Sequence, residues 1–195
     1  MYISQILAND TIREVQRKLY SPETVHAIIA GAFETSAKKL YRVSDSKILV
    51  VSDQQPSNPE KFEQLGGVVV TKSYNALLAG VCTGAKYRFT LKASPTKRDK
   101  SKGNRIFGHV TTEQQEEWLC GKAEANGFKL LSNRVVKRDT LDFKKQGNTI
   151  TIALATFDGV LEVVDAVGFR EALTRGIGRS KAYGAGLLTV GKIDG

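Results

Sequence analysis

The feature that most constrains the fold of this chain is an order of strands and helices that occurs twice along it. The first half begins with a β-rich segment at residues 2–8. Ser21, Pro22 and Glu23 are typical of a helix start, because serine caps the first turn, proline fits its first position and an acidic side chain favours the positive end of the helix dipole. Further strands are predicted at 41–43, 47–52 and 68–71.

The second half repeats this order. Tyr87 to Ala93 alternates apolar and polar side chains, which predicts a strand. Thr112 and Gln115 have the spacing of a capping box and predict the start of a helix that Gly127 ends. The remaining predicted elements are strands at 128–136, 140–143, 149–157 and 186–190 and a helix that begins after Asp165.

A hairpin turn is predicted within the second half at Asp158 and Gly159, because this dipeptide lies between two runs of β-forming residues. With the order strand, helix, strand, strand, helix, strand in each half, we expect an α+β protein made of two tandem ferredoxin-like (RRM-like) domains. We place them at 1–90 and 91–195. The first would carry His26, and the second would carry a basic segment and a glycine-rich loop.

Positive charge is concentrated in one short segment. The chain has 195 residues and a net charge of +9. Residues 91–110 hold six basic side chains and one acidic side chain, so they supply much of this excess. Such a patch suits a polyanion, because neutralised phosphates release their condensed counterions. A solvated basic loop without a partner explains the charge alone equally well.

The composition also indicates where the protein is expected to function. Its longest apolar runs, such as 48–51 and 68–70, are too short to cross a bilayer, and the N-terminus lacks the basic region of a signal peptide. Cys82 and Cys120 are isolated, so they form neither a disulfide framework nor a metal cluster. We therefore expect a cytoplasmic protein without metal or cofactor, in which both cysteines are small buried apolar side chains.

A basic, glycine-rich stretch, RGIGRSKAYGAG, lies at 175–186, just before the last predicted strand. It lacks the third glycine of a dinucleotide-binding fingerprint and the Gly-Lys-Ser order of a P-loop, and it does not open a helix as those motifs do. Its backbone amides could form an anion nest surrounded by Arg175, Arg179 and Lys181. A helix C-cap followed by a turn explains Gly176 well, but it leaves the three cations without an explanation.

The stretch from Phe157 to Val190 resembles the CasE (Cse3) family, the CRISPR precursor-RNA endoribonucleases of type I-E systems within the RAMP proteins. The glycine-rich turn followed by GLLTV is the hallmark of that family, and MYISQI, YRFTLKASPTK and TTEQQEEWL occur in matching order. The resemblance implies a tandem ferredoxin-like fold and metal-independent cleavage of precursor CRISPR RNA at the base of the repeat hairpin. It also implies a monomer outside the complex, which stays bound to the guide RNA with the other subunits of the Cascade surveillance complex.

Metal-free RNA cleavage uses the neighbouring 2′-hydroxyl as nucleophile, and histidine suits the transfer of its proton. Of the two histidines, His26 matches the catalytic histidine of the family in position, so the resemblance makes it the general base or the general acid. His109 keeps a structural role. Some family members have a tyrosine where Glu23 stands here, and Tyr20 is the nearest phenol. Tyr20 is therefore a candidate catalytic residue, although it lies on another face of the helix from His26. Glu23 either acts on His26 through its charge or favours the helix dipole.

Lys181 is the candidate for stabilising the phosphorane, because preorganised cations near developing charge stabilise a transition state. The other candidates bind RNA. They are Arg175, Gly176, Gly178, Arg179 and Ser180 in the glycine-rich stretch, and Lys97, Arg98, Lys100, Lys102 and Arg105 in the basic segment. A second, thinner basic group consists of Lys137, Arg138, Lys144 and Lys145. Two other functions stay open: a non-catalytic subunit of a ribonucleoprotein that binds hairpin RNA, and a purely structural subunit.

Overall fold

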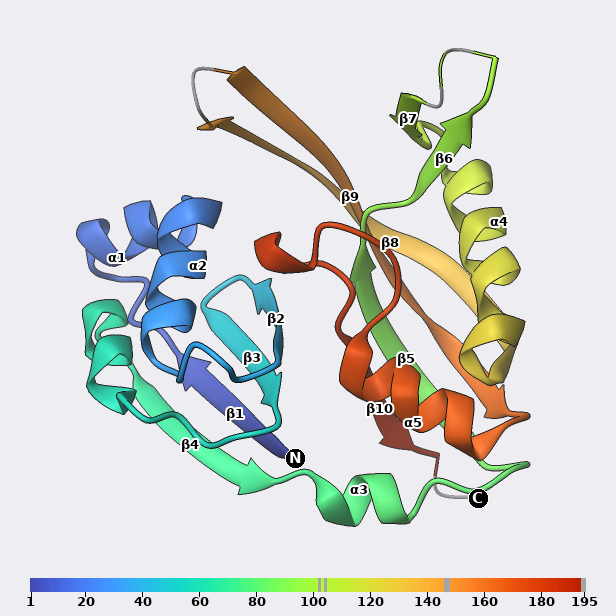
Figure 1. Ribbon diagram of the computed structural model, residues 1–195, viewed down its shortest axis with the longest axis horizontal. Coiled ribbons are helices and arrows are strands. Elements are labelled where there is room, and N and C mark those ends of the chain that lie inside the picture. The colour runs from blue at the N-terminus through green and yellow to red at the C-terminus, as the bar shows by residue number, and fades with distance from the viewer. Residues whose placement is uncertain (102, 104, 146–147, 194–195) are drawn as a thin grey trace. The chain divides into compact units, whose positions relative to one another are not determined.

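The computed structural model describes residues 1–101, 103, 105–145 and 148–193 (Figure 1). The chain divides into two compact units. Unit 1 contains Met1–Ala79 and Lys181–Gly184, and unit 2 contains Gly80–Ser180 and Ala185–Gly195. The division therefore differs from the predicted 1–90 and 91–195, because residues 80–90 include most of a strand that pairs within unit 2. The chain also leaves unit 2 at 181–184 and then returns to it.

Unit 1 has the strand order predicted for a ferredoxin-like fold. Its elements are β1 (Tyr2–Leu7), α1 (Arg13–Leu19), α2 (Pro22–Gly31), β2 (Lys39–Ser44), β3 (Lys47–Ser52), the 3-10 helix η1 (Pro59–Leu65), β4 (Val68–Ser73) and α3 (Asn75–Ala79). The four strands form an antiparallel sheet in the order β2–β3–β1–β4. The first strand thus lies between the third and the fourth, as the ferredoxin-like order requires.

Helix α2 covers the sheet of unit 1 because its apolar residues recur at helical spacing. Val25, Ile28 and Ile29 are buried in one cluster with Ile6 of β1 and Ile48 of β3. Fully burying an aliphatic side chain of this size contributes about 1.5–3 kcal/mol. The other side of α2 is thereby left to solvent.

Unit 2 repeats the order with an inserted hairpin. Its elements are β5 (Lys86–Ala93), β6 (Thr96–Asp99), β7 (Arg105–Gly108), α4 (Thr112–Ala123), the 3-10 helix η2 (Glu124–Asn126), β8 (Phe128–Lys145), β9 (Asn148–Val163), α5 (Ala166–Arg175) and β10 (Leu188–Lys192). The large sheet is antiparallel in the order β10–β5–β9–β8, and β6 pairs with β7. Both predicted ferredoxin-like domains are therefore confirmed. In the described ranges no helix is long and apolar enough to cross a membrane.

Aromatic side chains fasten α4 and α5 to one face of the unit 2 sheet. Trp118 of α4 stacks on Phe157 of β9, with ring centroids 6.2 Å apart. Phe169 of α5 lies 6.0 Å from Tyr87 of β5 and 5.8 Å from Phe128 of β8, centroid to centroid. Such pairs contribute about 0.5–1.5 kcal/mol beyond the area that they bury. The helices are thus tied to three different strands.

The predicted hairpin at Asp158 and Gly159 is wrong, because both residues lie inside the continuous strand β9. Strand β8 is likewise one strand, not two. A Cβ on Gly159 would lie 2.1 Å from the carbonyl oxygen of Ser132, close to a register shift in β8 between Leu130 and Ser132. Glycine within a strand marks a close backbone approach or a bulge as well as a turn. The sequence shows the glycine but does not show the backbone that approaches it.

Two smaller predictions also require correction. The capping box of α4 is formed by Thr111 and Gln114, one residue earlier than predicted: the Gln114 N–H donates to the Thr111 hydroxyl at 3.3 Å. Two adjacent threonines and two adjacent glutamines fit the motif equally, and Gln115 instead donates its side-chain amide to the backbone oxygen of His109. Cys82 and Cys120 are exposed rather than buried.

Candidate active site

His26 lies on the solvent side of α2. The helix begins as predicted: Ser21 is the N-cap, its hydroxyl accepts a hydrogen bond from the Thr24 N–H at 3.3 Å, and Pro22 is the first helical residue. Glu23 is exposed in the first turn, where a carboxylate favours the helix dipole. The apolar residues of α2 face the core, so His26 is exposed and can meet a ligand without any unfolding.

A short segment from the other end of the sequence packs into the same unit. The 3-10 helix η3 (Lys181–Tyr183) contacts α2 and β2 within unit 1. The Tyr41 hydroxyl on β2 donates to the backbone oxygen of Ala182 at 2.6 Å. Gly184 follows with a φ of 77°, and a Cβ on it would lie 3.1 Å from the Tyr41 ring. Tyr41 and Gly184 therefore hold η3 against unit 1.

The position of η3 places a phenol beside His26. The ring centroids of His26 and Tyr183 are 6.4 Å apart, with their planes inclined by 47°. Lys181 begins the same short helix, so the structure brings His26 together with the segment that contains the predicted cation. Tyr183 was not among the residues that the sequence predicted for this site. The sequence feature that could have pointed to Tyr183 is that it is the sole aromatic residue of the stretch RGIGRSKAYGAG.

Burial alters the protonation of two groups in this part of unit 1. It raises the pKa of Tyr41, to which the nearby Tyr183 adds, so Tyr41 keeps its proton and remains a donor to Ala182. Burial lowers the pKa of Lys181, because partial removal of water disfavours the charged ammonium. A phosphate close to Lys181 would replace the missing solvation and stabilise its charge.

Tyr20 lies at the end of α1. It is the C-cap residue of that helix, and 86% of it is exposed. With Arg13, Gln16 and Arg17 it lines a shallow hollow on the surface of unit 1. The ring contact of His26 is with Tyr183. A catalytic role for Tyr20 stays a prediction.

Unit 2 holds the glycine-rich turn that precedes η3. Gly176 ends α5 as its C-cap with a φ of 72°, and Gly178 has a φ of 84°. A Cβ on Gly178 would lie 3.1 Å from the Trp118 indole. The Ile177 N–H donates to the backbone oxygen of Gly186 at 2.9 Å. Backbone conformation and close packing therefore account for both glycines, and the anion nest stays a prediction.

The polar residues of this turn differ in their surroundings. Arg175 ends α5 and lies 3.5 Å from the Glu171 carboxylate, which suits a cation at a helix C-terminus. Arg179 is exposed. Ser180 is half-buried and has a φ of 60°, a left-handed conformation that is costly for a residue other than glycine. It stands immediately before the chain enters unit 1. Contact of these residues with RNA stays a prediction.

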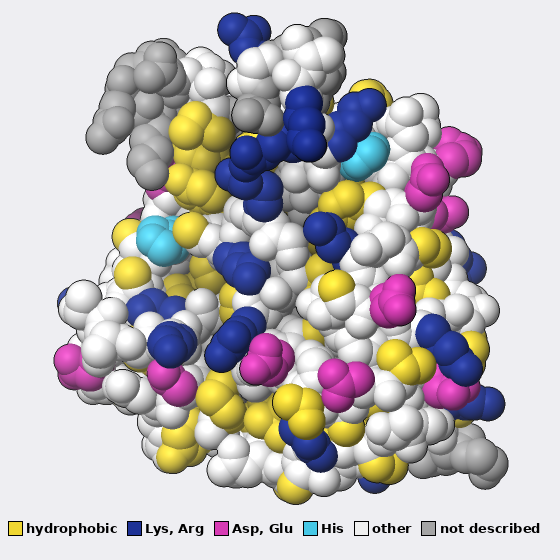
Figure 2. Space-filling view, turned by 45° about the vertical axis from the view of Figure 1, so that its right-hand side comes forward, with side chains coloured by type: hydrophobic (Ala, Val, Ile, Leu, Met, Phe, Trp, Pro, Cys, Tyr) yellow, Lys and Arg dark blue, Asp and Glu magenta, His cyan; other side chains and the backbone are white. Residues whose placement is uncertain are grey.

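The basic segment forms the β6–β7 hairpin of unit 2. Lys97, Arg98, Lys100 and Arg105 are exposed, whereas Lys102 lies outside the described residues. Figure 2 shows Lys and Arg side chains gathered in the upper part of the face that it draws, with few acidic side chains among them. Two short paired strands thus present several cations to solvent, which is what a phosphate backbone requires.

The second basic group is partly engaged within the protein. Arg138 donates to the backbone oxygen of Val110, at the start of the segment that leads into α4. The Lys137 ammonium lies 4.0 Å from the Asp139 carboxylate. The side chains of Lys144 and Lys145 lie outside the described part of the structure. Arg138 therefore has a structural contact of its own.

His109 fits the structural role that was expected for it. It follows β7 and is half-buried. Its Nδ1 atom is buried and has no hydrogen-bond partner among the described residues. Burial lowers the pKa of His109, and the charge of Lys97 lowers it further. The neutral imidazole is thereby favoured at neutral pH.

Fold and site together define a tandem ferredoxin-like protein in which a C-terminal segment returns to the histidine-bearing unit. The chain belongs to the CRISPR associated protein family, whose model matches residues 1–192. The predicted membership of the CasE (Cse3) group is confirmed. The chain is 27% identical to the CRISPR-associated endoribonuclease Cse3 of Thermus thermophilus, over 97% of this chain and 99% of that protein.

Solved structures agree with this relationship. A structure of CRISPR endoribonuclease Cse3 bound to a 19-nucleotide RNA is 25% identical, has a TM-score of 0.86 and covers 97% of each chain. The CRISPR-associated protein Cas6e from Escherichia coli str. K-12 is 23% identical, has a TM-score of 0.71 and covers 99% of this chain and 100% of that one. The second likeness shows the fold alone.

Proposed function

We propose that this chain is a metal-independent endoribonuclease that cleaves precursor CRISPR RNA at the base of the repeat hairpin. We further propose that it keeps the mature guide RNA as a subunit of Cascade. The Thermus relative is named an endoribonuclease, and a similar structure, of CRISPR endoribonuclease Cse3, contains RNA. These relatives support the substrate class, and the site geometry supports the chemistry.

The observation that carries the proposal is the placement of η3 in the unit of His26. The Tyr41 hydroxyl and Gly184 hold this segment, and the Tyr183 ring lies beside the imidazole. The four-stranded sheet of unit 1 is complete without η3. The fold of unit 1 therefore does not require this segment from the other end of the sequence to pack there. The placement of η3 is explained if His26, as a proton carrier, and Lys181, as a cation, act in one site.

The reaction is an internal transfer of the phosphate. The 2′-oxygen attacks the adjacent phosphorus and the bond from phosphorus to the 5′-oxygen breaks, which leaves a 2′,3′-cyclic phosphate and a 5′-hydroxyl. One proton leaves the 2′-hydroxyl and one reaches the 5′-oxygen, so the step balances without a redox partner. His26 carries one of these protons, and Lys181 stabilises the charge on the phosphorane. Tyr20 and Tyr183 are the two phenols that could assist.

RNA binding is assigned to the residues that present cations to solvent. The β6–β7 hairpin would hold the phosphates of the stem, because double-stranded RNA is recognised mostly through shape and phosphate. The glycine-rich turn, with Arg175, Arg179 and Ser180, would contact the RNA close to Lys181. Neither surface needs to contribute to bond breaking. Binding and cleavage can therefore be separated by substitution.

The test is cleavage of a repeat-hairpin RNA in EDTA by the wild-type protein, His26→Ala and His109→Gln. We expect cleavage by the wild type and by His109→Gln, and a loss of about 100- to 10,000-fold in His26→Ala, because a positioned proton carrier contributes that much. All three proteins should bind the RNA with similar affinity. His109→Gln is the matched control, since it changes the other histidine of the chain.

Two further results would decide against the proposal. Binding by the wild type without cleavage in EDTA would indicate a non-catalytic hairpin-RNA-binding subunit or a metal-dependent enzyme, which addition of Mg²⁺ distinguishes. Cleavage of an RNA with a 2′-deoxy substitution at the scissile nucleotide would exclude the 2′-hydroxyl as nucleophile. The expected result is that this substrate binds and stays intact.

A further inference from the structure

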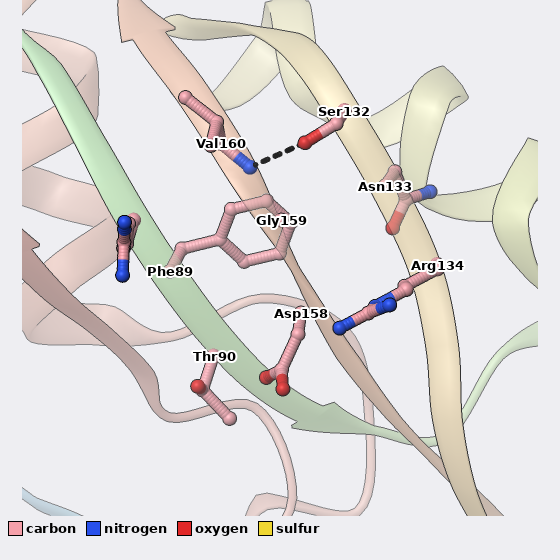
Figure 3. A pocket seen from close by; sticks show the side chains of 9 residues that line it. Phe89, Thr90, Ser132, Asn133, Arg134, Asp158, Gly159 and Val160 are labelled. Carbon is pink, nitrogen blue, oxygen red and sulfur yellow. Dashed lines mark hydrogen bonds between the residues drawn. The ribbon is translucent and has the colours of Figure 1, made fainter.

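A hollow of about 550 Å³ lies on the large sheet of unit 2, and its lining residues belong to neither η3 nor the β6–β7 hairpin. Three strands line it (Figure 3). The lining residues are Arg88, Phe89 and Thr90 of β5, Ser132, Asn133 and Arg134 of β8, and Asp158, Gly159 and Val160 of β9. Its volume is in the range of sites for small ligands, and one nucleotide would fit it.

Three polar side chains of the hollow share one face of the sheet. Thr90 pairs with Asp158, and Asp158 pairs with Arg134, so the three form a row across β5, β9 and β8. Figure 3 shows them side by side. Alternate residues of β5, such as Phe89, are buried, whereas Arg88 is exposed. Since side chains alternate along a strand, the row and Arg88 lie on the face opposite to α4 and α5.

The backbone irregularity of β8 and β9 helps to form this hollow. Gly159 has no side chain, and the Ser132 backbone approaches it closely at the register shift. The Ser132 hydroxyl accepts a hydrogen bond from the Val160 N–H at 3.0 Å, as Figure 3 shows. The bulged strand is thereby fixed in place. A defined backbone around a concave surface is what a specific binding site requires.

One carboxylate oxygen of the hollow has no partner in the described part of the protein. Asp158 Oδ1 is buried and has no hydrogen-bond partner among the described residues. Arg134 stands directly across from Asp158, yet the ion pairs between described residues do not include this one. A buried carboxylate oxygen without a donor is costly. It is the kind of group that a ligand with N–H donors would satisfy.

The carboxylate and the two arginines of the hollow together indicate which class of ligand would bind there. A free phosphate in the hollow would lie close to the arginines and also to the Asp158 carboxylate, and the negative charge of Asp158 would repel it. A ligand with both adjacent N–H donors and a phosphate suits Asp158 and the two arginines together. Guanine presents N1–H and the 2-amino group side by side, whereas cytosine and adenine offer only an amino group. In a helical stem cytosine occupies that edge, so the guanine has to be unpaired.

We infer that the hollow on the β5–β9–β8 face binds an unpaired guanosine nucleotide of the RNA. Asp158 accepts hydrogen bonds from the guanine edge, and Arg88 and Arg134 contact the flanking phosphates or stack on the base. This inference rests on the proposed function only in that RNA is the ligand. It adds a site that reads one unpaired base of the RNA and takes no part in bond breaking.

The test is direct binding of labelled pentanucleotides, r(UUGUU) and the same RNA with inosine, adenosine or cytidine at the centre. Inosine removes only the 2-amino group. We expect the wild type to bind the guanosine RNA at least about tenfold more tightly than the adenosine and cytidine RNAs, with inosine between them. In Asp158→Asn this preference should fall to less than about twofold, while Arg134→Ala should weaken all four RNAs alike.

Asp142→Asn is the matched control, because it is the same change on the same sheet and the asparagine oxygen can still accept the hydrogen bond from Thr151. It should keep the preference for guanosine. Equal binding of all four RNAs by the wild type would overturn the inference, and so would an unchanged preference in Asp158→Asn. Thermal unfolding of each variant verifies that it is folded.

Cleavage of the hairpin RNA, measured on the same preparations, separates this inference from the proposed function. A guanosine preference in a wild type that does not cleave would refute the nuclease alone. Cleavage by a wild type without the preference would refute the guanosine site alone. We expect Asp158→Asn to cleave bound hairpin RNA at the wild-type rate.

Discussion

The two units share one strand order and differ in what is added to it. Unit 1 has short connections, and its site is completed by η3, which the chain supplies after α5. Unit 2 carries the basic β6–β7 hairpin between its first strand and its first helix, and its β8 and β9 extend over 18 and 16 residues. The repeated order provides two sheets of the same topology, and the additions distinguish the two units.

The comparison suggests a division between chemistry and binding. The groups suited to proton transfer and charge stabilisation, His26 and Lys181, belong to unit 1. The exposed cations of the hairpin and the guanosine hollow belong to unit 2. If this division holds, substitutions in unit 1 should change the cleavage rate of bound RNA. Substitutions in unit 2 should change affinity.

After that of His26→Ala, the largest effect is expected for Lys181→Met, with a fall of about 100- to 1,000-fold in the single-turnover rate and little change in RNA affinity, because a preorganised cation is lost. Since burial lowers the pKa of Lys181 in the free protein, kcat/KM of the wild type, which reports the free enzyme, should decline as the pH rises through a value below the ordinary 10.5 of lysine. Lys181→Arg keeps its charge and should not show this decline. A large loss of RNA affinity in Lys181→Met, with an unchanged cleavage rate, would assign Lys181 to RNA binding instead of catalysis.

Gly159→Val tests the bulged sheet of unit 2. A side chain there meets the Ser132 backbone, so we expect a loss of about 2–3 kcal/mol in the free energy of unfolding, measured by urea denaturation. Gly121→Ala is the control within the same unit. No atom would lie within 4 Å of its new Cβ on α4, so stability should rise by about 0.5–1 kcal/mol. Equal stability of Gly159→Val and the wild type would contradict the close approach.

Removal of the hairpin cations should weaken binding without slowing the chemistry. For the triple variant Lys97→Ala, Arg98→Ala, Arg105→Ala, we expect about tenfold weaker RNA binding at moderate salt and a log–log salt slope smaller in magnitude by about 2–3. The rate at saturating protein should not change. A triple variant with the same charge difference in unit 1, at the exposed Lys47, Lys61 and Lys72, should bind like the wild type. Equal losses in both would indicate a general effect of net charge.

The smallest effect concerns the two phenols. Tyr183→Phe removes the hydroxyl of the ring that lies beside His26 and should lower the cleavage rate by about three- to tenfold, which corresponds to one hydrogen bond. Tyr20→Phe is the comparison, because that side chain is almost fully exposed at the end of α1. The pair shows which phenol assists. A larger loss in Tyr20→Phe would assign the role to the tyrosine that the sequence indicates.

Much of the fold could be predicted because it depends on short-range patterns. The alternation in Tyr87–Ala93 and the Ser21-Pro22 helix start concern residues that are neighbours in sequence, and both appear as predicted. The failures have a different cause. Asp158-Gly159 fits a turn by local preference, but β8 pairs with β9 through this position and approaches it too closely for any side chain. Long-range pairing overrides a local preference where the two disagree.

The sequence by itself determined the repeated strand order, the position of His26 on an amphipathic helix and the concentration of charge in residues 91–110. Each follows from periodicity or composition within a few turns of chain. Only the tertiary structure decided that Tyr183 lies beside His26 and that Asp158 faces a hollow with an unpaired oxygen. These facts depend on which distant backbones pack together. That packing is determined by the burial and hydrogen bonding of the whole unit, not by any one segment.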